Sequence, residues 1–513
     1  MQVILVLLPI IIIFFLLIFK RTPADISGLV GWFITALIAG LFFETPILII
    51  LKSSFSGILA SLPIALVVAT SILQVTIMQE AGAIDRVVAL IKTISPQNKT
   101  VQIMIINIGF GTLLAALGAV PVSILPPIML AMGYSSFIAI ALPSLGYDAL
   151  CTYALLGIPV VVFSGFVGLP VQEAGMFFAR FMPIISTCIA LGMLWIVGRW
   201  KLLLKGFLPA VLSGLTAGLI AIGMNKIGLV TLTGIAAGAG VIGIMILYLF
   251  LTKQPIRDRN ALNDKDLASE KKISLLAAIS PWLALTFFSL IVNAPFLPFF
   301  KLFFVDLAMP IEIIPGEPEK IRFFWQAYFW ILISTLLCLP FLKLSKEQLS
   351  SSITTWFKRF PRPMLSAAIF FAIAFVINHS GKSMDWQLLH PENNMIFILA
   401  DASAKTFGRL YPLAAPFLGL LGGFVSGSET SSIAMLTPLH LSTAEKIKGA
   451  GILIAAASGI GGGLASVISP AKLQNAAASI DRIGEETSVI STTLGIALVI
   501  TLVCAVVTLI WAF

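Results

Sequence analysis

Long apolar runs separated by short polar connections occupy almost the whole chain, and they constrain its fold more than any other feature. A run of roughly twenty apolar residues spans the hydrocarbon core of a membrane as a helix. Charged residues make up 11% of the 513 residues, and the mean hydropathy is +1.05. A soluble domain carries about 25% charged residues. We therefore expect an all-α, multi-pass protein of the cytoplasmic membrane, surrounded by lipid.

Fifteen apolar runs are candidate spans. Several contain helix-breaking residues and are expected to break or re-enter, so we expect about 11 to 14 full crossings. The first run has no basic residues before it and no small-residue cleavage site, so we interpret it as a spanning helix rather than a cleaved signal. The candidate spans are residues 1–19, 28–43, 57–79, 101–120, 122–141, 143–169, 176–198, 206–224, 228–252, 273–298, 323–342, 364–380, 411–440, 447–470 and 488–512.

Two interrupted apolar stretches keep the same internal spacing. A broken helix in a membrane must satisfy its freed backbone groups against protein or a water-filled cavity. Paired broken segments in two halves of a chain indicate a binding site between them. Three residues of the first stretch recur 311 residues later: Gly111 as Gly422, Pro127 as Pro438 and Pro159 as Pro470.

Lysine and arginine gather in alternate connections. Residues 80–100, 199–205, 253–272 and 343–362 are rich in them, whereas 225–227 and 299–322 are poorer. By the positive-inside rule the rich connections are cytoplasmic, the N-terminus lies outside, and the two broken regions are entered from opposite sides. This predicts two inverted-topology repeats. We expect 253–272 and 343–362 to be short solvated linkers.

These features divide the chain into four parts. Residues 1–56 are N-terminal membrane helices, and 201–342 are connecting helices and loops. The first repeat is 57–200, broken near 109–127 and 143–159. The second is 343–513, broken near 420–438 and 458–470.

The densest polar cluster within an apolar region is residues 426–432. Such a stretch suits an unwound tip between two half-helices, where N–H groups and hydroxyls converge on an anion. Glu429 is a functional candidate because a carboxylate at membrane depth is costly. The alternative is an ordinary extramembrane turn with an exposed glutamate. The hydroxyl candidates for substrate binding here are Ser426, Ser428, Thr430, Ser431 and Ser432.

Other polar residues are candidates outside this cluster. Lys472 is a charge partner for Glu429 or the substrate, or else a cytoplasmic anchor that extends its ammonium to the interface. Asp148 is a second buried carboxylate, or else a helix cap. The remaining substrate-binding candidates are Thr112, Ser123, Thr152 and Ser469.

Several function classes find no support in the sequence. There is no P-loop, so ATP-driven pumping is not expected, and the net charge of +9 sits between the spans rather than in a nucleic-acid-binding patch. The four cysteines and three histidines lack metal-ligand spacing, so we expect no metal and no cofactor. His379 is interpreted as a helix-end residue, with a proton relay as the alternative.

The polar motifs resemble those of the lactate permease family. PFLGLLGGFVSGSETSSIAML is similar to that family's glycine-rich helix end followed by Gly-Ser-Asp-Thr-Ser-Ser, with Glu429 in place of the usual Asp. AIAFVINHSG and GGGLASVISPAKLQNAAASI are similar to further segments of the family. The family's first-half Glu-Gly-Ala-Ala-Gly-Phe-Gly is replaced by Ala115-Ala-Leu-Gly-Ala-Val-Pro121, so this is a divergent member.

The resemblance implies a secondary active transporter, a symporter of small monocarboxylates such as lactate or glycolate. Protons would drive it, with sodium as the alternative, and either Glu429 or Asp148 would bind the proton. Another anion, such as a dicarboxylate or an oxyanion, stays open as the substrate, and so does a homodimeric assembly. The alternatives from other classes are a channel and an intramembrane hydrolase that uses Ser428 with His379 or His440.

Overall fold

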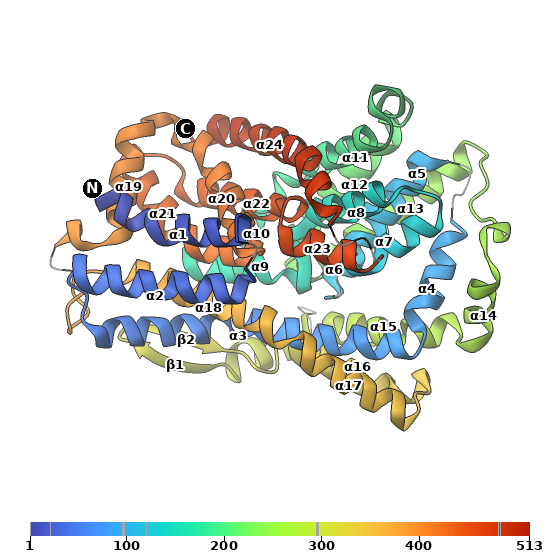
Figure 1. The fold of residues 1–513 in the computed structure, drawn as a ribbon, viewed down its shortest axis with the longest axis horizontal. Helices are drawn as coiled ribbons and strands as arrows, with labels where there is room; N and C mark the ends of the chain where they lie inside the picture. Colours follow the sequence, from blue (N-terminus) through green and yellow to red (C-terminus); the bar gives the residue numbers. More distant parts are fainter. Residues whose placement is uncertain are drawn as a thin grey trace.

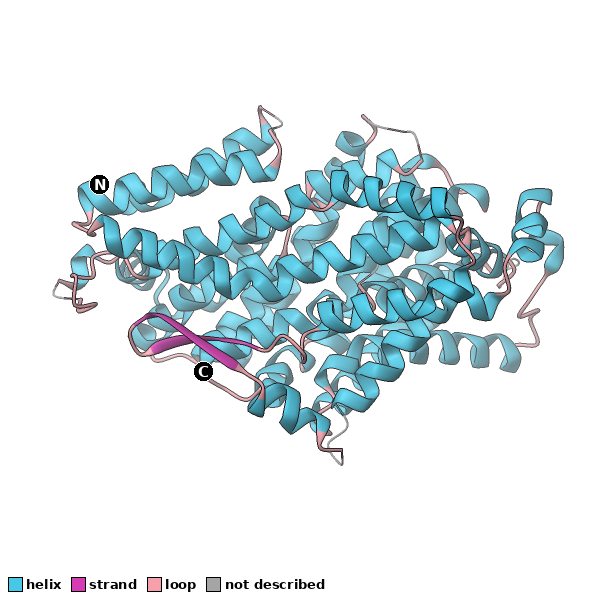
Figure 2. Cartoon of the chain, turned by 90° about the horizontal axis from the view of Figure 1, so that it is seen from below, coloured by secondary structure: helices cyan, strands magenta, loops and turns pink. Residues whose placement is uncertain are grey.

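The computed structural model describes residues 2–20, 22–94, 98–118, 121–293, 297–388, 390–480, 482 and 484–513. Within them the chain is a bundle of helices with one small β-hairpin (Figures 1 and 2). Eleven of the described helices are long and apolar enough to cross a membrane. That number lies in the predicted range and confirms a multi-pass, predominantly helical membrane protein.

The helices of the first half and the connecting part are α1 (Gln2–Ile18), α2 (Ala24–Phe42), α3 (Ile47–Glu80), α4 (Ala83–Lys92), α5 (Lys99–Ile103), η1 (Met104–Phe110), α6 (Gly111–Ala116), α7 (Pro121–Ala131), α8 (Ser136–Tyr147), η2 (Asp148–Tyr153), α9 (Ala154–Val167), α10 (Val171–Ala179), α11 (Met182–Lys205), α12 (Phe207–Lys226), η3 (Val230–Leu232), α13 (Thr233–Leu251), η4 (Arg259–Ala261), α14 (Asp264–Lys272), α15 (Leu275–Asn293) and η5 (Lys301–Asp306). The strands β1 (Met309–Ile314) and β2 (Glu317–Ile321) follow. The remaining helices are α16 (Ala327–Leu342), α17 (Lys346–Arg359), α18 (Pro361–Asn378), η6 (Pro391–Asn393), α19 (Met395–Phe407), η7 (Gly408–Leu410), α20 (Tyr411–Ser426), α21 (Glu429–Ile447), α22 (Gly451–Leu464), η8 (Ala465–Val467), α23 (Pro470–Ala478) and α24 (Glu486–Trp511).

The helices break where the sequence places glycine, proline and serine. Leu155, Leu156 and Gly157 have φ of 53°, 57° and 76°, which interrupts the helix at the start of α9. The corresponding positions 311 residues later are 466–468, where η8 separates α22 from α23. Gly427 at φ 69° likewise separates α20 from α21. The second breaks of the two halves therefore keep the spacing that the sequence shows.

Helices of the two halves extend to opposite ends of the molecule, α5 of the first half to one end and α19 of the second half to the other (Figure 1). At one end, Tyr134 after α7 donates a hydrogen bond to Gln102 in α5. At the other end, Lys446 at the close of α21 contacts Asp401 in α19. Figure 1 shows α19, α20 and the C-terminus on the left, and α5 and α13 on the right, with α9, α22 and α23 between them. The opposite entry of the two broken regions stays a prediction.

Hydroxyl groups satisfy the carbonyls that the breaks release. A backbone carbonyl without a partner inside a membrane is costly, so each break needs such a donor. The donors come from the turn itself or from a neighbouring helix. They are Ser186 to the carbonyl of Ala149 (2.6 Å), Ser426 to that of Ser428 (3.0 Å) and Thr493 to that of Val467 (3.0 Å).

Glycine permits backbone contact between α20 and α22. A Cβ atom on Gly419 would lie 1.8 Å from the carbonyl oxygen of Ser458, and one on Gly423 would lie 2.1 Å from that of Gly462. Small residues let membrane helices approach closely and so gain dispersion energy. This contact holds the hairpin of α20 and α21 against the second broken helix.

Two connections differ from the solvated linkers that the sequence predicted. Residues 253–272 contain α14, which docks on α4 through a buried ion pair between Lys92 and Asp266 at 2.8 Å. Residues 343–362 contain α17, which packs along α3, where Trp356 donates to the carbonyl of Ala69 at 2.8 Å. Most residues of both helices are exposed, as in solvated linkers, but paired charges and apolar stems also dock the helices onto the bundle.

A β-hairpin in the connection 299–322 was not predicted. Strands β1 and β2 pair antiparallel and lie against α3. Glu317 reaches His379 and Lys382 after α18, at 3.5 and 3.6 Å. Burial raises the pKa of Glu319 to about 7, and the neighbouring Glu317 charge adds to this. His379 is the C-cap residue of α18, so it lies at a helix end, as the sequence predicted.

We predict that the hydroxyl donors at the breaks contribute more to stability than hydroxyls within continuous helices. Ser186→Ala leaves the carbonyl of Ala149 without its donor, which costs about 1–3 kcal/mol. The matched control is Ser144→Ala, because Ser144 is equally buried but bonds only within its own helix. Thermal unfolding in detergent should show a lower Tm for Ser186→Ala alone. Equal Tm values for both variants would contradict the prediction.

Candidate functional site

The first half of the site is the break between α8 and α9. Here η2 departs from regular helix, with Leu150 at φ −143° and ψ 41°. Tyr153 anchors η2, because its hydroxyl donates to the carbonyl of Gly175 and accepts from Asn225. Thr152, one residue earlier, is thereby held with its side chain buried in the protein interior.

The second half is the turn between α20 and α21. Gly427 takes a left-handed conformation, and the extended Ser428 follows it. Ser428 caps α21, because its hydroxyl accepts from the backbone N–H of Ser431 at 3.3 Å. Glu429 is the first residue of α21, where the positive end of the helix dipole faces its side chain.

One hydrogen bond joins the two halves. The hydroxyl of Thr152 donates to Oε1 of Glu429 at 2.6 Å, across 277 residues of sequence. Glu429 is only 3% exposed, and α21 packs against α9. The carboxyl group of Glu429 therefore lies at the contact between the two broken regions.

Three buried polar atoms on Glu429 and on residues near it in the two breaks have no partner within the described part of the chain. They are Oε2 of Glu429 and the hydroxyls of Ser431 and Ser469. Gly463 borders the same oxygen, since a Cβ atom there would lie 2.7 Å from Oε2. Ser469 borders the turn, 3.6 Å from a Cβ atom built on Gly427. Buried polar groups are nearly always paired, so these three atoms are candidates for contact with a polar ligand.

Lys472 supplies positive charge beside the site. Its ammonium group donates to the hydroxyl of Ser466 and lies 4.1 Å from the ring centre of Tyr147. It also acts through space on the Glu429 carboxyl group. Lys472 is half-buried. Its contacts favour a role at the site over that of an interfacial anchor.

Several predicted binding residues have structural hydrogen bonds instead. Ser426 donates to the carbonyls of Gly422 and Ser428, and Ser432 donates to that of Gly419. The prediction that 426–432 is unwound throughout was wrong. Only Gly427 and Ser428 leave the helix, because the cap at Ser428 restores helical hydrogen bonds from Glu429 onward.

The other candidates have mixed outcomes. Thr430 is buried in the first turn of α21. Thr112 is buried in α6 with no partner for its hydroxyl among the described residues, but no described hydrogen bond joins it to Glu429. The side chains of Ser123 and Asp148 lie outside what the structure describes, so both remain predictions.

Three further residues lie at the site. Gly463 lies against the Glu429 carboxyl group and Ser466 holds Lys472, and both belong to the polar stretch near 458–470 that the sequence singled out. Sequence reasoning missed Cys151, which interacts with the Glu429 carboxyl group. The glycine run at 461–463 was a usable signal, because a position without a side chain leaves room for a neighbour's carboxyl group.

The histidines lie at other hydrogen-bonded places. His440 bonds to the hydroxyl of Tyr411 at 2.7 Å, and His379 bonds to Lys382 at 2.9 Å. The hydroxyl of Ser428 serves as a helix cap. No described hydrogen bond joins either histidine to Ser428, so the arrangement that a serine hydrolase needs is not formed among these residues.

Known proteins resemble this chain along nearly its whole length. It is 26% identical to the L-lactate permease of Escherichia coli K12, over 99% of this chain and 95% of that protein. It is 24% identical to the glycolate permease GlcA of the same organism, with the same coverage. It is also 24% identical to the L-lactate permease of Bacillus subtilis 168, over 98% of this chain and 94% of that protein.

A solved structure also resembles the fold. MtrF of Neisseria gonorrhoeae, described as belonging to a class of antimetabolite efflux pumps, matches with a TM-score of 0.43 and 15% identity, over 90% of this chain and 84% of MtrF. That score is too low to support an argument about function. The family model described as L-lactate permease, in contrast, matches residues 2–513. This chain therefore belongs to the L-lactate permease family, whose members are multi-pass membrane transporters rather than enzymes.

Proposed function

We propose that this protein is a secondary active transporter that moves a small monocarboxylate, of the lactate or glycolate type, together with a proton. The observation that carries this proposal is the buried Glu429 carboxyl group, bonded on one side to Thr152 and unpartnered on the other. The names of the relatives, lactate and glycolate permeases, support the choice of substrate class.

Coupling follows from the hydrogen-bonding capacity of a carboxyl group. When Glu429 is protonated, the proton on Oε2 can be donated to the substrate carboxylate, which is an acceptor only. When Glu429 is ionised, two carboxylates face each other and repel. Proton and substrate therefore bind together and leave together. A proton gradient can then drive accumulation of the anion.

Neighbouring groups complete the anion site in this proposal. The hydroxyls of Ser431 and Ser469 can donate to the second oxygen of the substrate carboxylate, and Lys472 supplies a positive charge. Alternating access would come from movement of one half against the other. The bond between Thr152 and Glu429 lies where such a movement would act.

Replacing Glu429 with glutamine tests the coupling. Glutamine keeps the shape and a donor for the substrate, but it cannot exchange a proton. In proteoliposomes, we expect Glu429→Gln to exchange labelled lactate across the membrane while losing accumulation driven by a pH gradient. Glu429→Ala should lose both activities. Full proton-driven accumulation by the glutamine variant would assign Glu429 a structural role.

The bond from Thr152 provides a second test. Thr152→Val keeps the shape but removes the donor to Glu429, and we expect about a tenfold loss of exchange rate, which corresponds to about 1.4 kcal/mol. Thr152→Ser should restore most of it. The control is Thr443→Val, since Thr443 is equally buried in α21, where its hydroxyl donates to the carbonyl of Leu439, and no described hydrogen bond joins it to Glu429. Equal rates for both valine variants would remove Thr152 from the site.

A dicarboxylate or an inorganic oxyanion is the alternative substrate. Hydroxyl donors and one lysine bind an anionic group but do not by themselves select the length of the substrate's carbon chain. We expect glycolate and lactate to compete with labelled lactate uptake at far lower concentrations than succinate or phosphate. Competition in the opposite order would replace the monocarboxylate with the better competitor. The panel is measured in proteoliposomes at one fixed pH gradient.

A further inference from the structure

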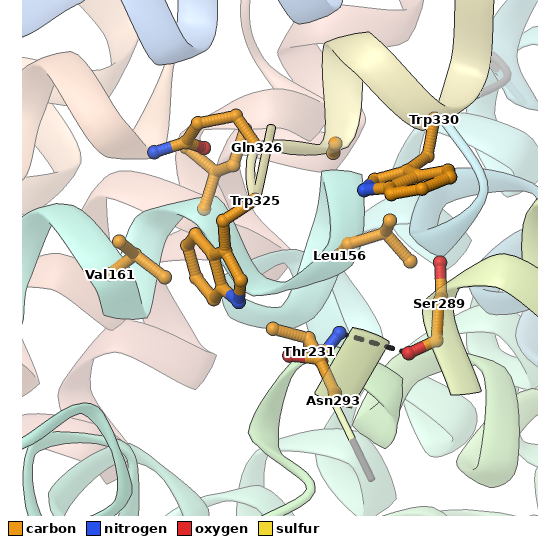
Figure 3. A pocket seen from close by; sticks show the side chains of 10 residues that line it. Leu156, Val161, Thr231, Ser289, Asn293, Trp325, Gln326 and Trp330 are labelled. Carbon is orange, nitrogen blue, oxygen red and sulfur yellow. Dashed lines mark hydrogen bonds between the residues drawn. The ribbon is translucent and has the colours of Figure 1, made fainter. Parts of the chain in front are cut away.

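A small cavity with polar groups in its lining borders the first-half break. It is lined by Leu156 of α9, Thr231 of η3, Ser289 of α15 and Trp325 before α16 (Figure 3). These elements belong to the connecting part of the chain as well as to the first half. The cavity thus borders the same break as Thr152, at a residue four positions later.

Three polar groups that line this cavity lack partners among the described residues. They are the hydroxyls of Thr231 and Ser289 and the indole N–H of Trp325, on side chains that are 7%, 2% and 7% exposed. Each unpaired group of this kind costs about 1–3 kcal/mol. Three such groups around one cavity are not expected unless something polar occupies it.

The donors define the chemistry of the occupant. An indole N–H can only donate a hydrogen bond, so the occupant must offer an acceptor, which a bare cation does not. The two hydroxyls can donate as well. No acidic side chain lines the cavity within the described residues, so nothing there repels an anion. A carboxylate, which accepts through both oxygens, satisfies all three donors.

The absence of a basic residue from the described lining sets the expected strength of binding. Lysine or arginine would hold a carboxylate tightly, whereas neutral donors hold it weakly. Weak binding suits a station on a transport path, where a ligand must leave as readily as it enters. The structure shows the cavity nearly closed, with about 20 Å³ open to the centre of a water molecule, which is room for a water but not for a carboxylate.

Leu156 is positioned to control entry. It lies between Trp325 and Ser289 in the cavity (Figure 3). Its own φ is 57°, within three consecutive left-handed residues. Non-glycine residues pay roughly 1–2 kcal/mol for this conformation, so a backbone change here would release strain while moving the Leu156 side chain.

We propose that this cavity is a second, transient binding station for the transported carboxylate, with Leu156 as its gate. This proposal rests on the proposed function. The station would hold the anion through Thr231, Ser289 and Trp325 on its way to or from Glu429. Its donors are neutral, whereas the site at Glu429 also holds the coupling proton and has Lys472 beside it.

The test measures labelled lactate exchange in proteoliposomes for Trp325→Phe, which removes the N–H and part of the indole but keeps an aromatic ring. We expect the KM to rise by about three- to tenfold for Trp325→Phe and to stay unchanged for the control variant, while both variants lose a similar amount of thermal stability because both lose the same buried atoms. The matched control is Trp282→Phe, because Trp282 in α15 is also buried with an unpartnered N–H but lies outside the cavity. Should Trp325→Phe fail to fold, Thr231→Val and Ser289→Ala test the same donors.

A spectroscopic measurement detects binding of lactate at the proposed station directly. In protein labelled with fluorotryptophan, the resonance that Trp325→Phe abolishes should shift when lactate is added, and the Trp282 resonance should not. Equal KM values for the two phenylalanine variants and an unmoved Trp325 resonance would show that the cavity holds water only. Absence of lactate exchange by the unmutated protein would instead refute the proposed function, and the two failures are thereby distinguishable.

Discussion

The need to satisfy backbone carbonyls inside a membrane governs this structure. Each helix break frees carbonyl groups, and lipid offers them no donor. Serine and threonine hydroxyls supply the missing hydrogen bonds at the breaks, from the turn itself or from α11 and α24. The breaks can therefore exist only where these helices pack against them. The surrounding bundle is a support for irregular backbone, and that backbone forms the site.

The carboxyl group of Glu429 gains its properties from this support. The Ser428 cap and the left-handed Gly427 aim it at the first half, and Gly463 leaves space for it. The hydroxyl of Thr152 then bonds one oxygen and leaves the other open. A buried acid with one satisfied and one open oxygen is suited to exchange a proton with an anionic ligand, because its free energy depends strongly on what occupies the open side.

The sequence allowed the membrane class, the number of spans and the places of the breaks to be predicted, because apolar run length, glycine and proline act locally. Glu429 stood out for the same reason, as a lone carboxylate in an apolar region. The partnership with Thr152 could not be predicted, since only tertiary packing brings residues 277 positions apart together. The docking of α14 depends likewise on Lys92, which is distant in sequence. The β-hairpin was not predicted, because its strands are short and mostly exposed.

The first-half break takes part in both the candidate site and the cavity. Thr152 on one side reaches Glu429, and Leu156 on the other borders the cavity of Trp325. Three left-handed residues, Leu155 to Gly157, follow Thr152, and only Gly157 adopts that conformation without cost. Strain of this kind persists only when the surrounding packing enforces it. A change of packing at the Trp325 cavity would therefore alter the strained backbone at Leu155 and Leu156. Through this backbone, the occupancy of the cavity and the position of Thr152 would affect each other.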